Sequence, residues 1–272
     1  MGKRLGIIAG SGEIPLLVFQ EADRLGYTCM VAGLSGETEV SFPNRTGSFE
    51  SFDASQIEDI IGYFKQRQTS EVIIAGKINH RKIYAIKDMN NSLSNLLASA
   101  QDMSPSSLIH VAIEFMSLKG ITVLNPARFL GAVFFDAGVL SETKLSPQIQ
   151  EDIDFGWNKA RALADSDVGQ TLVVKDRAVV AVEGMEGTDE AIKRGGRLAG
   201  AGTTVIKLSR SNQDLRVDLP AVGLSTIESL ADAESGALCI EANRVAFFQK
   251  DKAVSLADAK GIAVLAKGES YG

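Results

Sequence analysis

The sequence predicts an α/β protein of two domains, a parallel sheet covered by helices followed by a mixed sheet with helices. In the first half, short apolar runs alternate with amphipathic stretches, which is typical of parallel strands joined by helices. In the second half, β-branched runs follow one another without a helix between them, which indicates antiparallel neighbours. Between the halves, residues 125–150 hold two prolines and two glycines and follow neither pattern, so we expect the chain to cross between domains there. We therefore expect an N-terminal domain at 1–132 and a C-terminal domain at 133–272, which suits a chain of 272 residues.

Each element of the first half has its own local signal. The run 4–10 is almost continuously apolar and stops at glycine, as a buried parallel strand does, and 27–34 repeats the pattern. The stretch 11–26 has apolar residues at helical spacing and ends at Gly26, and 53–68 is amphipathic in the same way. The predicted order is strand 4–10, helix 11–26, strand 27–34, helix 53–68, strand 70–78, helix 104–120 and strand 121–126.

The second half mixes strands and helices less regularly. Two β-branched runs within 169–187, joined by Lys175-Asp176-Arg177, predict a hairpin, and 237–249 predicts a second one. Thr188 is the expected N-cap of the helix that follows the first hairpin. The other predicted elements are helices 151–167, 188–200, 222–233 and 251–261, strands 203–209 and 262–268, and a strand end at 217–220.

The composition argues against several classes of protein. The net charge is −6 and the sequence has no basic stripe with interleaved aromatic residues, so we expect no nucleic-acid partner. Cys29 and Cys239 lie far apart without metal-ligand spacing, which suits buried apolar residues in a reducing cytoplasm. The N-terminal apolar run is too short for a signal-peptide core. The most apolar segment, 129–140, is interrupted by Asp136 and too short to cross a bilayer, so we interpret it as core packing and expect a cytoplasmic protein.

Two glycine turns end predicted parallel strands and indicate a ligand crevice. Gly10, Ser11 and Gly12 lie between a strand and a helix, where small residues let a ligand approach and free N–H groups favour phosphate. Gly76 and Lys77 end another strand, and the ends of parallel strands share one edge of the sheet, where ligands bind. The dinucleotide fingerprint is incomplete because a proline replaces its third glycine, so a plain tight turn stays open as the alternative.

A second candidate group lies around the start of the helix at 188. Glu183, Glu186 and Asp189 are close in sequence and flanked by glycines, which would allow a metal ion or a phosphate to approach closely. A helix cap at Thr188 and a favourable dipole contact of Asp189 explain those two residues structurally, but they leave Glu183 at the end of an apolar strand unexplained. The same helix carries the cations Lys193, Arg194 and Arg197, for which a solvated face is the alternative.

A third candidate group interleaves anion-binding and acidic residues within 206–220. Its members are Lys207, Arg210, Gln213, Asp214, Arg216 and Asp218. Mg²⁺ is typically held by one or two carboxylates together with substrate phosphates, and phosphorus chemistry needs a metal or an arginine clamp. Asp218 stands between apolar residues beside a strand-to-helix turn, where an unpaired buried carboxylate would be costly. A structural ion-pair network would have a similar composition and stays open, and His80 and His110 have no ligand-spaced partners.

Three stretches taken together, 5–15, 168–196 and 213–228, resemble the bacterial UDP-2,3-diacylglucosamine pyrophosphatases of the LpxI type. The resemblance extends over nearly the whole chain, and 79–107 is its least characteristic part. It implies a substrate cleft between a Rossmann-like N-terminal domain and a distinct C-terminal one. It also implies Mg²⁺-dependent hydrolysis, with Mn²⁺ as the other candidate ion, of the pyrophosphate in UDP-2,3-diacylglucosamine. The products would be UMP and 2,3-diacylglucosamine 1-phosphate (lipid X), a step towards lipid A.

The resemblance also implies roles for individual residues. Asp218 matches the aspartate of the family's DxP turn and is expected to act in catalysis with Asp189 and Arg216. The expected metal ligands are Asp218, Asp189 and Glu183. Substrate binding is expected at Gly10, Ser11, Gly12, Gly76, Lys77, Thr188, Lys207 and Gln213.

The lipid substrate implies a peripheral position at the inner face of the inner membrane, and a homo-oligomer stays open. Two other functions remain as alternatives. One is a nucleotide-dependent reductase, for which the acidic residue expected about 20 positions after the glycine turn has no clear match. The other is a nucleotide-sugar sensor or a scaffold without catalysis, in which the charged cluster would be structural.

Overall fold

The structure is a computed structural model that describes residues 2–38, 42, 47–78 and 104–268. The chain forms two compact units: unit 1 comprises Met1–Gly131 and Asp214–Asp218, and unit 2 comprises Ala132–Gln213 and Leu219–Gly272. The predicted two-domain α/β fold is confirmed, with a parallel sheet in the first unit and a mixed sheet in the second. The sequence prediction kept 214–218 with the C-terminal domain, whereas the structure assigns these residues to unit 1. The predicted substrate cleft between the domains stays a prediction.

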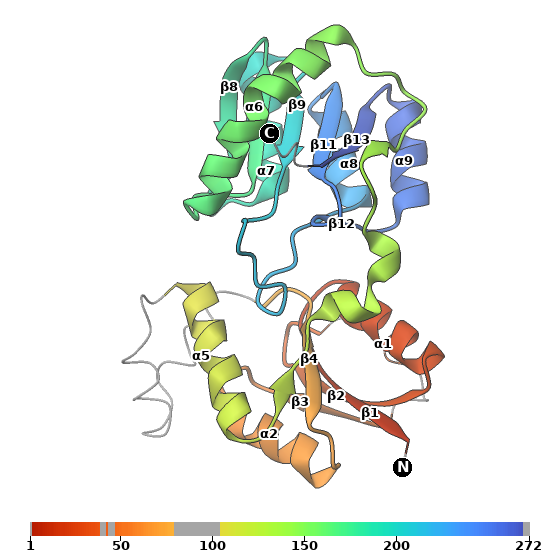
Figure 1. Ribbon diagram of the computed structural model, residues 1–272, viewed down its shortest axis with the longest axis vertical. Helices are drawn as coiled ribbons and strands as arrows, with labels where there is room; N and C mark the ends of the chain where they lie inside the picture. The colour runs from red at the N-terminus through yellow and green to blue at the C-terminus, as the bar shows by residue number, and fades with distance from the viewer. Residues whose placement is uncertain (1, 39–41, 43–46, 79–103, 269–272) are drawn as a thin grey trace. The chain divides into compact units, whose positions relative to one another are not determined.

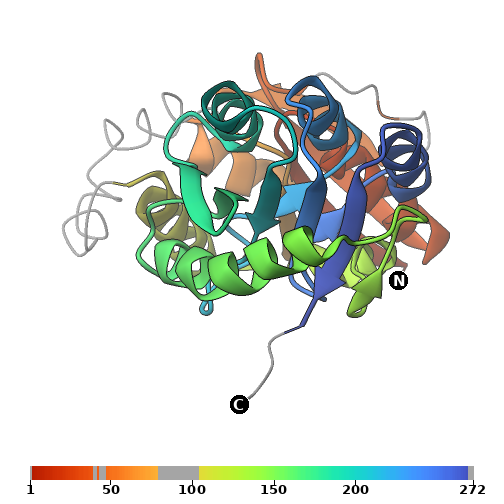
Figure 2. The ribbon, with the colours of Figure 1, turned by 90° about the horizontal axis from the view of Figure 1, so that it is seen from above.

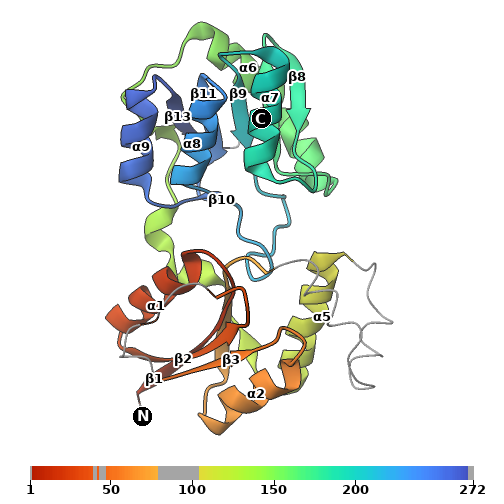
Figure 3. The same ribbon diagram turned by 180° about the vertical axis from the view of Figure 1, so that it is seen from behind.

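Unit 1 is a parallel sheet with helices on both faces (Figure 3). Within the described residues its strand order is β3-β2-β1-β4-β5. The strands are β1 (Lys3–Ala9), β2 (Tyr27–Leu34), β3 (Ser48–Phe52), β4 (Glu71–Ala75) and β5 (Thr122–Val123). The helices are α1 (Ile14–Arg24), α2 (Ile57–Gln66) and α5 (Pro105–Leu118), followed by the short turns η2 (Pro126–Phe129) and η3 (Gly131–Val133).

The two faces of the unit 1 sheet are covered by different helices. Ile8, Met30 and Val72 lie on one face and belong to a buried cluster with apolar residues of α2 and α5. Helix α1 packs on the other face, with Val18 and Phe19 buried. Residues 5–9 of β1 are continuously apolar and buried because both sides of the strand are covered, as in other parallel sheets.

Unit 2 is built on a mixed sheet with the order β6-β13-β11-β9-β7-β8 in the described part of the chain (Figure 1). Strands β9, β11 and β13 are mutually parallel, and the flanking strands β6, β7 and β8 run antiparallel to their neighbours. The strands are β6 (Gly138–Val139), β7 (Thr171–Lys175), β8 (Ala178–Val182), β9 (Thr204–Lys207), β11 (Ala237–Glu241) and β13 (Ala263–Lys267). A separate parallel pair is formed by β10 (Ala221–Val222) and β12 (Ala246–Phe247).

Four helices cover the sheet of unit 2 among the described residues: α6 (Pro147–Asp165), α7 (Thr188–Ala199), α8 (Leu224–Asp232) and α9 (Lys250–Ala259). Figure 2 shows α6 on one face and the other three on the opposite face. Helix α6 starts with a serine cap and a proline in its first turn, and Ser146 Oγ accepts a hydrogen bond from Ile149 N at 3.2 Å. Its Trp157 lies in a buried cluster with Leu172 and Ile206 of the sheet, so this face is a closed apolar layer.

Several sequence predictions are confirmed and others are wrong. The hairpin within 169–187 forms, and Asp176 and Arg177 have φ of 51° and 58°, as a two-residue hairpin turn requires. The predicted hairpin at 237–249 is wrong, because β11 pairs with β9 and β13 while β12 pairs with β10. The predicted strand end at 217–220 is also wrong, since 214–218 forms a turn, and strand β3 was not predicted.

Candidate functional site

The two glycine turns of unit 1 lie against each other at the carboxyl ends of β1 and β4. Ser11 N donates to Lys77 O at 2.8 Å, Lys77 N donates to Ser11 O at 3.0 Å, and Gly10 N donates to Ala75 O at 2.8 Å. A Cβ on Gly10 would lie 2.3 Å from Lys77 O, and one on Gly76 would lie 2.5 Å from Ser11 O. Both glycines are therefore explained by the close approach of two backbones, and Gly76 also has a φ of +89°.

This pairing changes which N–H groups could bind a phosphate. The N–H groups of Gly10 and Ser11 donate within the fold and are not directed at a ligand. Gly12, with a φ of +87° and open space around its Cα, is the member of the turn whose N–H has no acceptor recorded among the described residues. The structure thus brings the five predicted turn residues together, and among the described residues the N–H groups of Gly12 and Gly76 have no backbone acceptor. The phosphate contact itself stays a prediction.

Residues 214–218 form a turn seated in unit 1. Val217 N and Asp218 N donate to Asp214 O at 3.0 and 3.2 Å, which closes the turn. The Val217 side chain packs against the apolar cluster of α2 and α5 described above. The predicted catalytic Arg216 is held by Asp214 through Nε at 3.0 Å and Nη2 at 2.7 Å, a two-point arginine–carboxylate contact.

His110 of α5 contacts this turn. Its Nε2 lies 3.2 Å from Asp214 Oδ2, and its Nδ1 lies 2.9 Å from Ser106 O. Because a carbonyl and a carboxylate only accept hydrogen bonds, both contacts are hydrogen bonds only when each ring nitrogen carries a proton. The hydrogen bonds and charge of Arg216, with the charge of His110 as a smaller contribution, hold the pKa of Asp214 below its ordinary value. His110 therefore has a partner that the sequence did not reveal, while His80 lies outside the described residues.

Asp218 is exposed at the end of this turn. The expectation of a costly buried carboxylate was wrong, because the residue lies on a turn rather than inside a strand. An exposed carboxylate is free of the desolvation cost that would otherwise have to be offset by a cation. Its accessibility suits a group that acts on a ligand.

In unit 2 the structure brings Glu183, Thr188 and Lys207 together with Thr171. Lys207 is buried at the end of β9, and its Nζ donates to Thr188 Oγ1 at 2.7 Å and to Thr171 Oγ1 at 3.3 Å. Thr188 Oγ1 in turn donates to Glu183 Oε1 at 3.0 Å. Glu183 Oε2 is buried without a hydrogen bond, 3.8 Å from Lys207 Nζ. The cluster is a buried ion pair bridged by a threonine, so the predicted substrate-binding cation Lys207 has its donors directed at protein groups.

The predicted N-cap role of Thr188 was wrong. Gly187, with a φ of 87°, is the N-cap of α7, and no side chain caps it. Thr188 is the first helical residue and uses its hydroxyl for the lysine and glutamate instead. Asp189 lies in the first turn of α7, where a negative charge interacts favourably with the helix dipole.

The other charged residues of this stretch form surface pairs. Arg194 binds Glu186 and donates to Val182 O at 2.7 Å, and its hydrogen bond lowers the pKa of Glu186. Lys193 pairs with Glu190 at 3.0 Å on the same helix. The surface ion pairs of Lys193 and Arg194 therefore account for these two residues, in agreement with the alternative of a solvated helix face.

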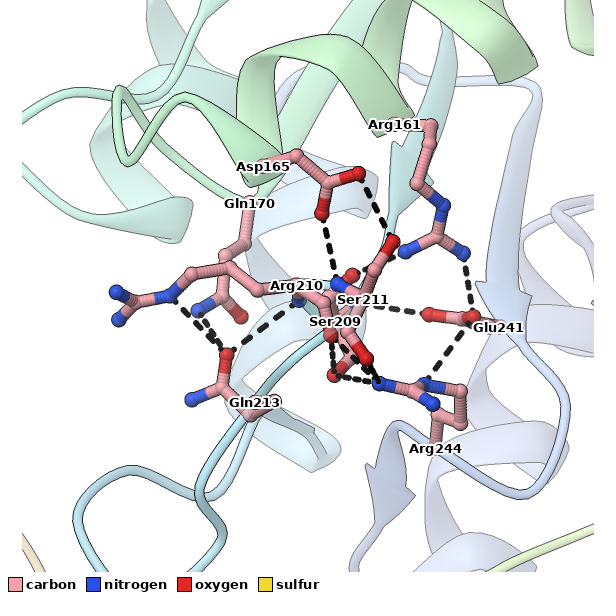
Figure 4. Close-up of polar contacts among 9 residues, drawn as sticks. All are labelled: Arg161, Asp165, Gln170, Ser209, Arg210, Ser211, Gln213, Glu241 and Arg244. Atoms are coloured by element: carbon pink, nitrogen blue, oxygen red, sulfur yellow. Dashed lines mark hydrogen bonds and ion pairs between the residues drawn. The ribbon is translucent and has the colours of Figure 1, made fainter.

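A second buried cluster in unit 2 centres on Glu241, at the carboxyl end of β11 (Figure 4). Its side chain is 2 % exposed and faces two guanidinium groups, those of Arg161 on α6 and Arg244. Glu241 Oε2 also accepts from Ser209 N at 2.8 Å, and Arg161 donates to Ser209 O. The buried carboxylate is thus paired and hydrogen-bonded, which offsets its desolvation cost. Sequence reasoning missed these residues because they come from three separate segments.

The same network holds Gln213, a predicted substrate contact. Gln213 Oε1 accepts from Arg210 Nε at 3.2 Å and from Gln170 Nε2 at 3.3 Å. Arg210 also pairs with Asp167 at 2.8 Å, which leaves the sequence-predicted cation in an ion pair. Gln213 and Arg210 therefore stabilise the conformation of the segment that follows β9.

The donor set can be compared with what Mg²⁺ requires. In the part of the chain that the structure describes, no group of three or more His, Cys, Asp or Glu side chains is placed to hold a metal ion. An Mg²⁺ ion shared with a diphosphate needs only one or two protein carboxylates, and the exposed carboxylate of Asp218 is of the right chemistry. Glu183 fits less well, because Lys207 already provides its positive partner.

Comparison with known proteins agrees with this two-part organisation. Residues 4–133 match the family model described as the LpxI N-terminal domain, and residues 136–265 match that of the LpxI C-terminal domain. The chain belongs to the LpxI family. A curated relative from Caulobacter vibrioides, named UDP-2,3-diacylglucosamine pyrophosphatase LpxI, is 26 % identical over 274 residues, covering 97 % of this chain and 97 % of the relative.

Two solved structures are distantly similar to this LpxI family member. A UDP-Glc/GlcNAc 4-epimerase from Campylobacter jejuni aligns over 99 % of this chain and 88 % of its own, at 10 % identity and a TM-score of 0.35. A GalE-like L-threonine dehydrogenase from Cupriavidus necator aligns over 99 % and 96 %, at 10 % identity and a TM-score of 0.31. Neither similarity supports a functional inference. No helix in the described residues is long and apolar enough to cross a membrane.

Proposed function

We propose that this protein hydrolyses the pyrophosphate of UDP-2,3-diacylglucosamine, releasing UMP and 2,3-diacylglucosamine 1-phosphate. The observation that carries the proposal is the relative from Caulobacter vibrioides, which carries the name of this activity and aligns with 97 % of both chains. A match of that extent includes both units and the segment with Asp218.

The reaction consumes one water molecule. Its oxygen becomes bonded to one phosphorus, the bridging oxygen stays with the other, and the two protons of water end on the products or the solvent. Asp218, as an exposed carboxylate on a closed turn, would orient that water or hold a cation against the diphosphate. Asp218 would hold Mg²⁺, which would neutralise diphosphate charge when bound.

Other groups of the chain would position the substrate. The Gly12 end of the glycine turn would receive a phosphate or the nucleotide through backbone N–H groups at the start of α1. The guanidinium of Arg216, whose charge Asp214 balances, would lie beside Asp218 along the same turn. Because the substrate carries acyl chains, the protein would meet it at a membrane surface.

The test is UMP release from UDP-2,3-diacylglucosamine by the pure protein and by Asp218→Asn. The wild type is expected to turn over with Mg²⁺ and not with EDTA, and Asp218→Asn is expected to lose about 100-fold or more in kcat. Asp251→Asn, which removes another exposed carboxylate, at the start of α9, is the matched control and should keep full activity. Fluorescence of the single tryptophan, Trp157, reports whether unit 2 of each variant is folded.

No UMP from the wild type over long incubation would overturn the proposed hydrolysis, and full activity in Asp218→Asn would overturn the role given to Asp218. Substrate binding without product would favour the sensor or scaffold. Running the reaction in heavy-oxygen water and locating the label in UMP or in the lipid phosphate identifies the phosphorus that is attacked.

A further inference from the structure

Residues 208–220 connect β9 to β10 and carry Asp218; we name this segment the arm. Its first leg is held at the carboxyl ends of the parallel strands of unit 2. Glu241 accepts from Ser209 N, and Arg244 Nη2 donates to Arg210 O at 2.6 Å and to Ser211 O at 3.0 Å (Figure 4). The backbone of this leg is thus bound by the side chains of Glu241, the last residue of β11, and Arg244, in the connection to α9.

The second leg is held by the same connection. Ala246 N donates to Pro220 O at 2.8 Å, and Phe248 N donates to Val222 O at 2.9 Å, alongside the parallel pairing of β10 with β12. Val245, between Arg244 and this pair, is fully buried and cannot shift without disturbing the core. One stretch, Glu241–Phe248, therefore binds both legs of the arm through groups that are two to seven residues apart.

Arg244 is placed to link the two legs. Its Nε lies 3.3 Å from Glu241 Oε1, so the guanidinium is oriented by a buried carboxylate that Arg161 also binds. Its other end reaches two successive carbonyls of the first leg, and its backbone precedes the residues that pair with the second leg. A charged group that bonds several acceptors at once fixes their relative position more firmly than a neutral contact does.

Asp218 itself lies on the part of the arm that has no strand or helix. Its place therefore depends on what holds the legs, on the turn that Asp214 closes and on the contacts of that turn with unit 1. We propose that Arg244 and Glu241 are positioning residues, which fix the legs of the arm and thereby hold Asp218 for the hydrolysis. This proposal rests on the proposed function for its effect on turnover, but its effect on the arm does not depend on any substrate.

Arg244 is the residue to change because its side chain is 41 % exposed, so its removal leaves no closed cavity. Arg244→Ala removes both carbonyl contacts of the leg and the second cation of Glu241. Arg244→Lys keeps the charge, but a single ammonium cannot reach Glu241 and both carbonyls together. Arg177→Ala is the matched control, because Arg177 lies in the same unit and its side chain forms an exposed pair with Glu151 at 3.7 Å, while its backbone bond to Asp152 does not depend on that side chain.

The first readout is hydrogen exchange of the full-length protein without substrate. In Arg244→Ala the amides of 208–220 are expected to exchange about tenfold faster than in the wild type, since a leg held by fewer bonds opens more often. Amides of β7 and β9 should be unchanged, as should Trp157 fluorescence. Arg177→Ala should match the wild type throughout. Unchanged exchange in the arm of Arg244→Ala would overturn the proposal, as would equal acceleration in all strands of unit 2.

The second readout is the steady-state hydrolysis of UDP-2,3-diacylglucosamine. A displaced catalytic group lowers kcat by about 10- to 100-fold while KM changes by less than about threefold. Arg244→Lys should recover part of kcat, and Glu241→Gln, which keeps the acceptor for Ser209 N, should resemble Arg244→Ala. Faster arm exchange with wild-type kcat would refute the positioning role. A wild type that releases no UMP would refute the proposed function. Hydrogen exchange of the arm in Arg244→Ala would still decide whether Arg244 holds the arm.

Discussion

Replacing Lys207 tests whether this residue stabilises the fold or serves as a free cation for substrate. The ammonium and the Glu183 carboxylate are 7 % and 14 % exposed, and Nζ lies 3.8 Å from Oε2. At that separation two unit charges attract by about 4 kcal/mol with an effective dielectric constant of about 20. Removing one partner of such a pair leaves an uncompensated buried charge, at a cost of about 3–5 kcal/mol. We take the lower end for Lys207→Met, because Glu183 keeps some contact with solvent.

The double-mutant cycle makes this prediction specific to the pair. Lys207→Met and Glu183→Gln should each lower the free energy of unfolding by about 3 kcal/mol. The double variant should lose about as much as either single change, which gives a coupling of about 3 kcal/mol. Thr188 then loses the donor that Lys207 supplied, but the two uncompensated charges disappear together.

The assay is urea unfolding followed by fluorescence of Trp157, which packs against β7 and β9 and so reports unit 2. Lys252→Met, an exposed lysine of α9, is the matched control and should change stability by less than about 0.5 kcal/mol. Additive single effects, with a coupling below about 0.5 kcal/mol, would refute the buried pair. A Lys207→Met protein of wild-type stability with a strongly raised KM would instead restore the substrate-binding role.

Three further predictions concern the rest of the chain. Gly10→Ala should destabilise unit 1 by about 1–3 kcal/mol, because its Cβ would lie 2.3 Å from Lys77 O. Gly62→Ala is the control and should not destabilise the unit, because a Cβ there meets open space in α2. Thermal unfolding followed by circular dichroism measures both, and a Gly10→Ala variant that unfolds at the wild-type temperature would contradict the close approach. Burial raises the pKa of both cysteine thiols to about 12, so iodoacetamide at pH 8 should label the unfolded but not the native protein, and rapid native labelling would show that the thiols are accessible. Asp214→Asn should be less stable than the wild type at neutral pH, because the bonds from Arg216 lower the pKa of Asp214 in the folded state. The stabilisation is therefore complete above about pH 4, the unfolded pKa, and is lost as the pH falls through the lower folded pKa. Urea unfolding at several pH values measures the difference in the free energy of unfolding between the wild type and Asp214→Asn. A difference that grows towards acid pH would contradict the argument.

Local patterns in the sequence were sufficient for most elements of the fold. The run 27–34 coincides with β2, and the stop predicted at Gly26 is a residue with a φ of +80° directly after α1. These signals depend only on neighbouring residues. Strand β3, with the sequence SFESF, lacks an apolar face because it lies at the edge of the sheet, so no such signal marks it.

Pairing between distant segments was not accessible from local patterns. The segment 237–249 has two apolar runs and a turn residue, Asn243, with a φ of 58°, which together favour a hairpin. The first run instead fills the gap between β9 and β13, where both its sides and both its edges are covered. The second run pairs with β10, the strand that follows the arm. Burial on both edges outweighs the local turn preference, and sequence alone does not state which partner strands are available.

The candidate site shows the same division. The sequence was sufficient to identify the glycine turns and the Asp218 segment as candidates, because their residues lie in short contiguous motifs. Glu241, Arg161 and Arg244 were not, because each is an ordinary charged residue until the fold brings the end of β11 beside α6 and the arm. The one sequence signal was a glutamate that ends an otherwise apolar run, the same signal that drew attention to Glu183. In both cases the structure pairs that glutamate with a cation from another element, so such a position predicts a buried ion pair better than a metal ligand.

Under the proposed positioning role, the arm would hold Asp218 in place although this residue is exposed. Its legs belong to unit 2 and its tip, 214–218, to unit 1, so the chain passes from one unit to the other and back within a few residues. Asp218 is the last residue of the tip, so it depends on the tip bonds made by Asp214 as well as on the leg bonds made by Arg244. The three substitutions already described therefore separate three contributions. Asp218→Asn removes the carboxylate alone, Asp214→Asn loosens the tip, and Arg244→Ala loosens the legs. If both the tip and the legs position Asp218, Asp214→Asn and Arg244→Ala should each lower kcat in the wild-type background. Neither should lower kcat further in the Asp218→Asn background, because the position of a side chain that no longer takes part in the reaction does not affect the rate.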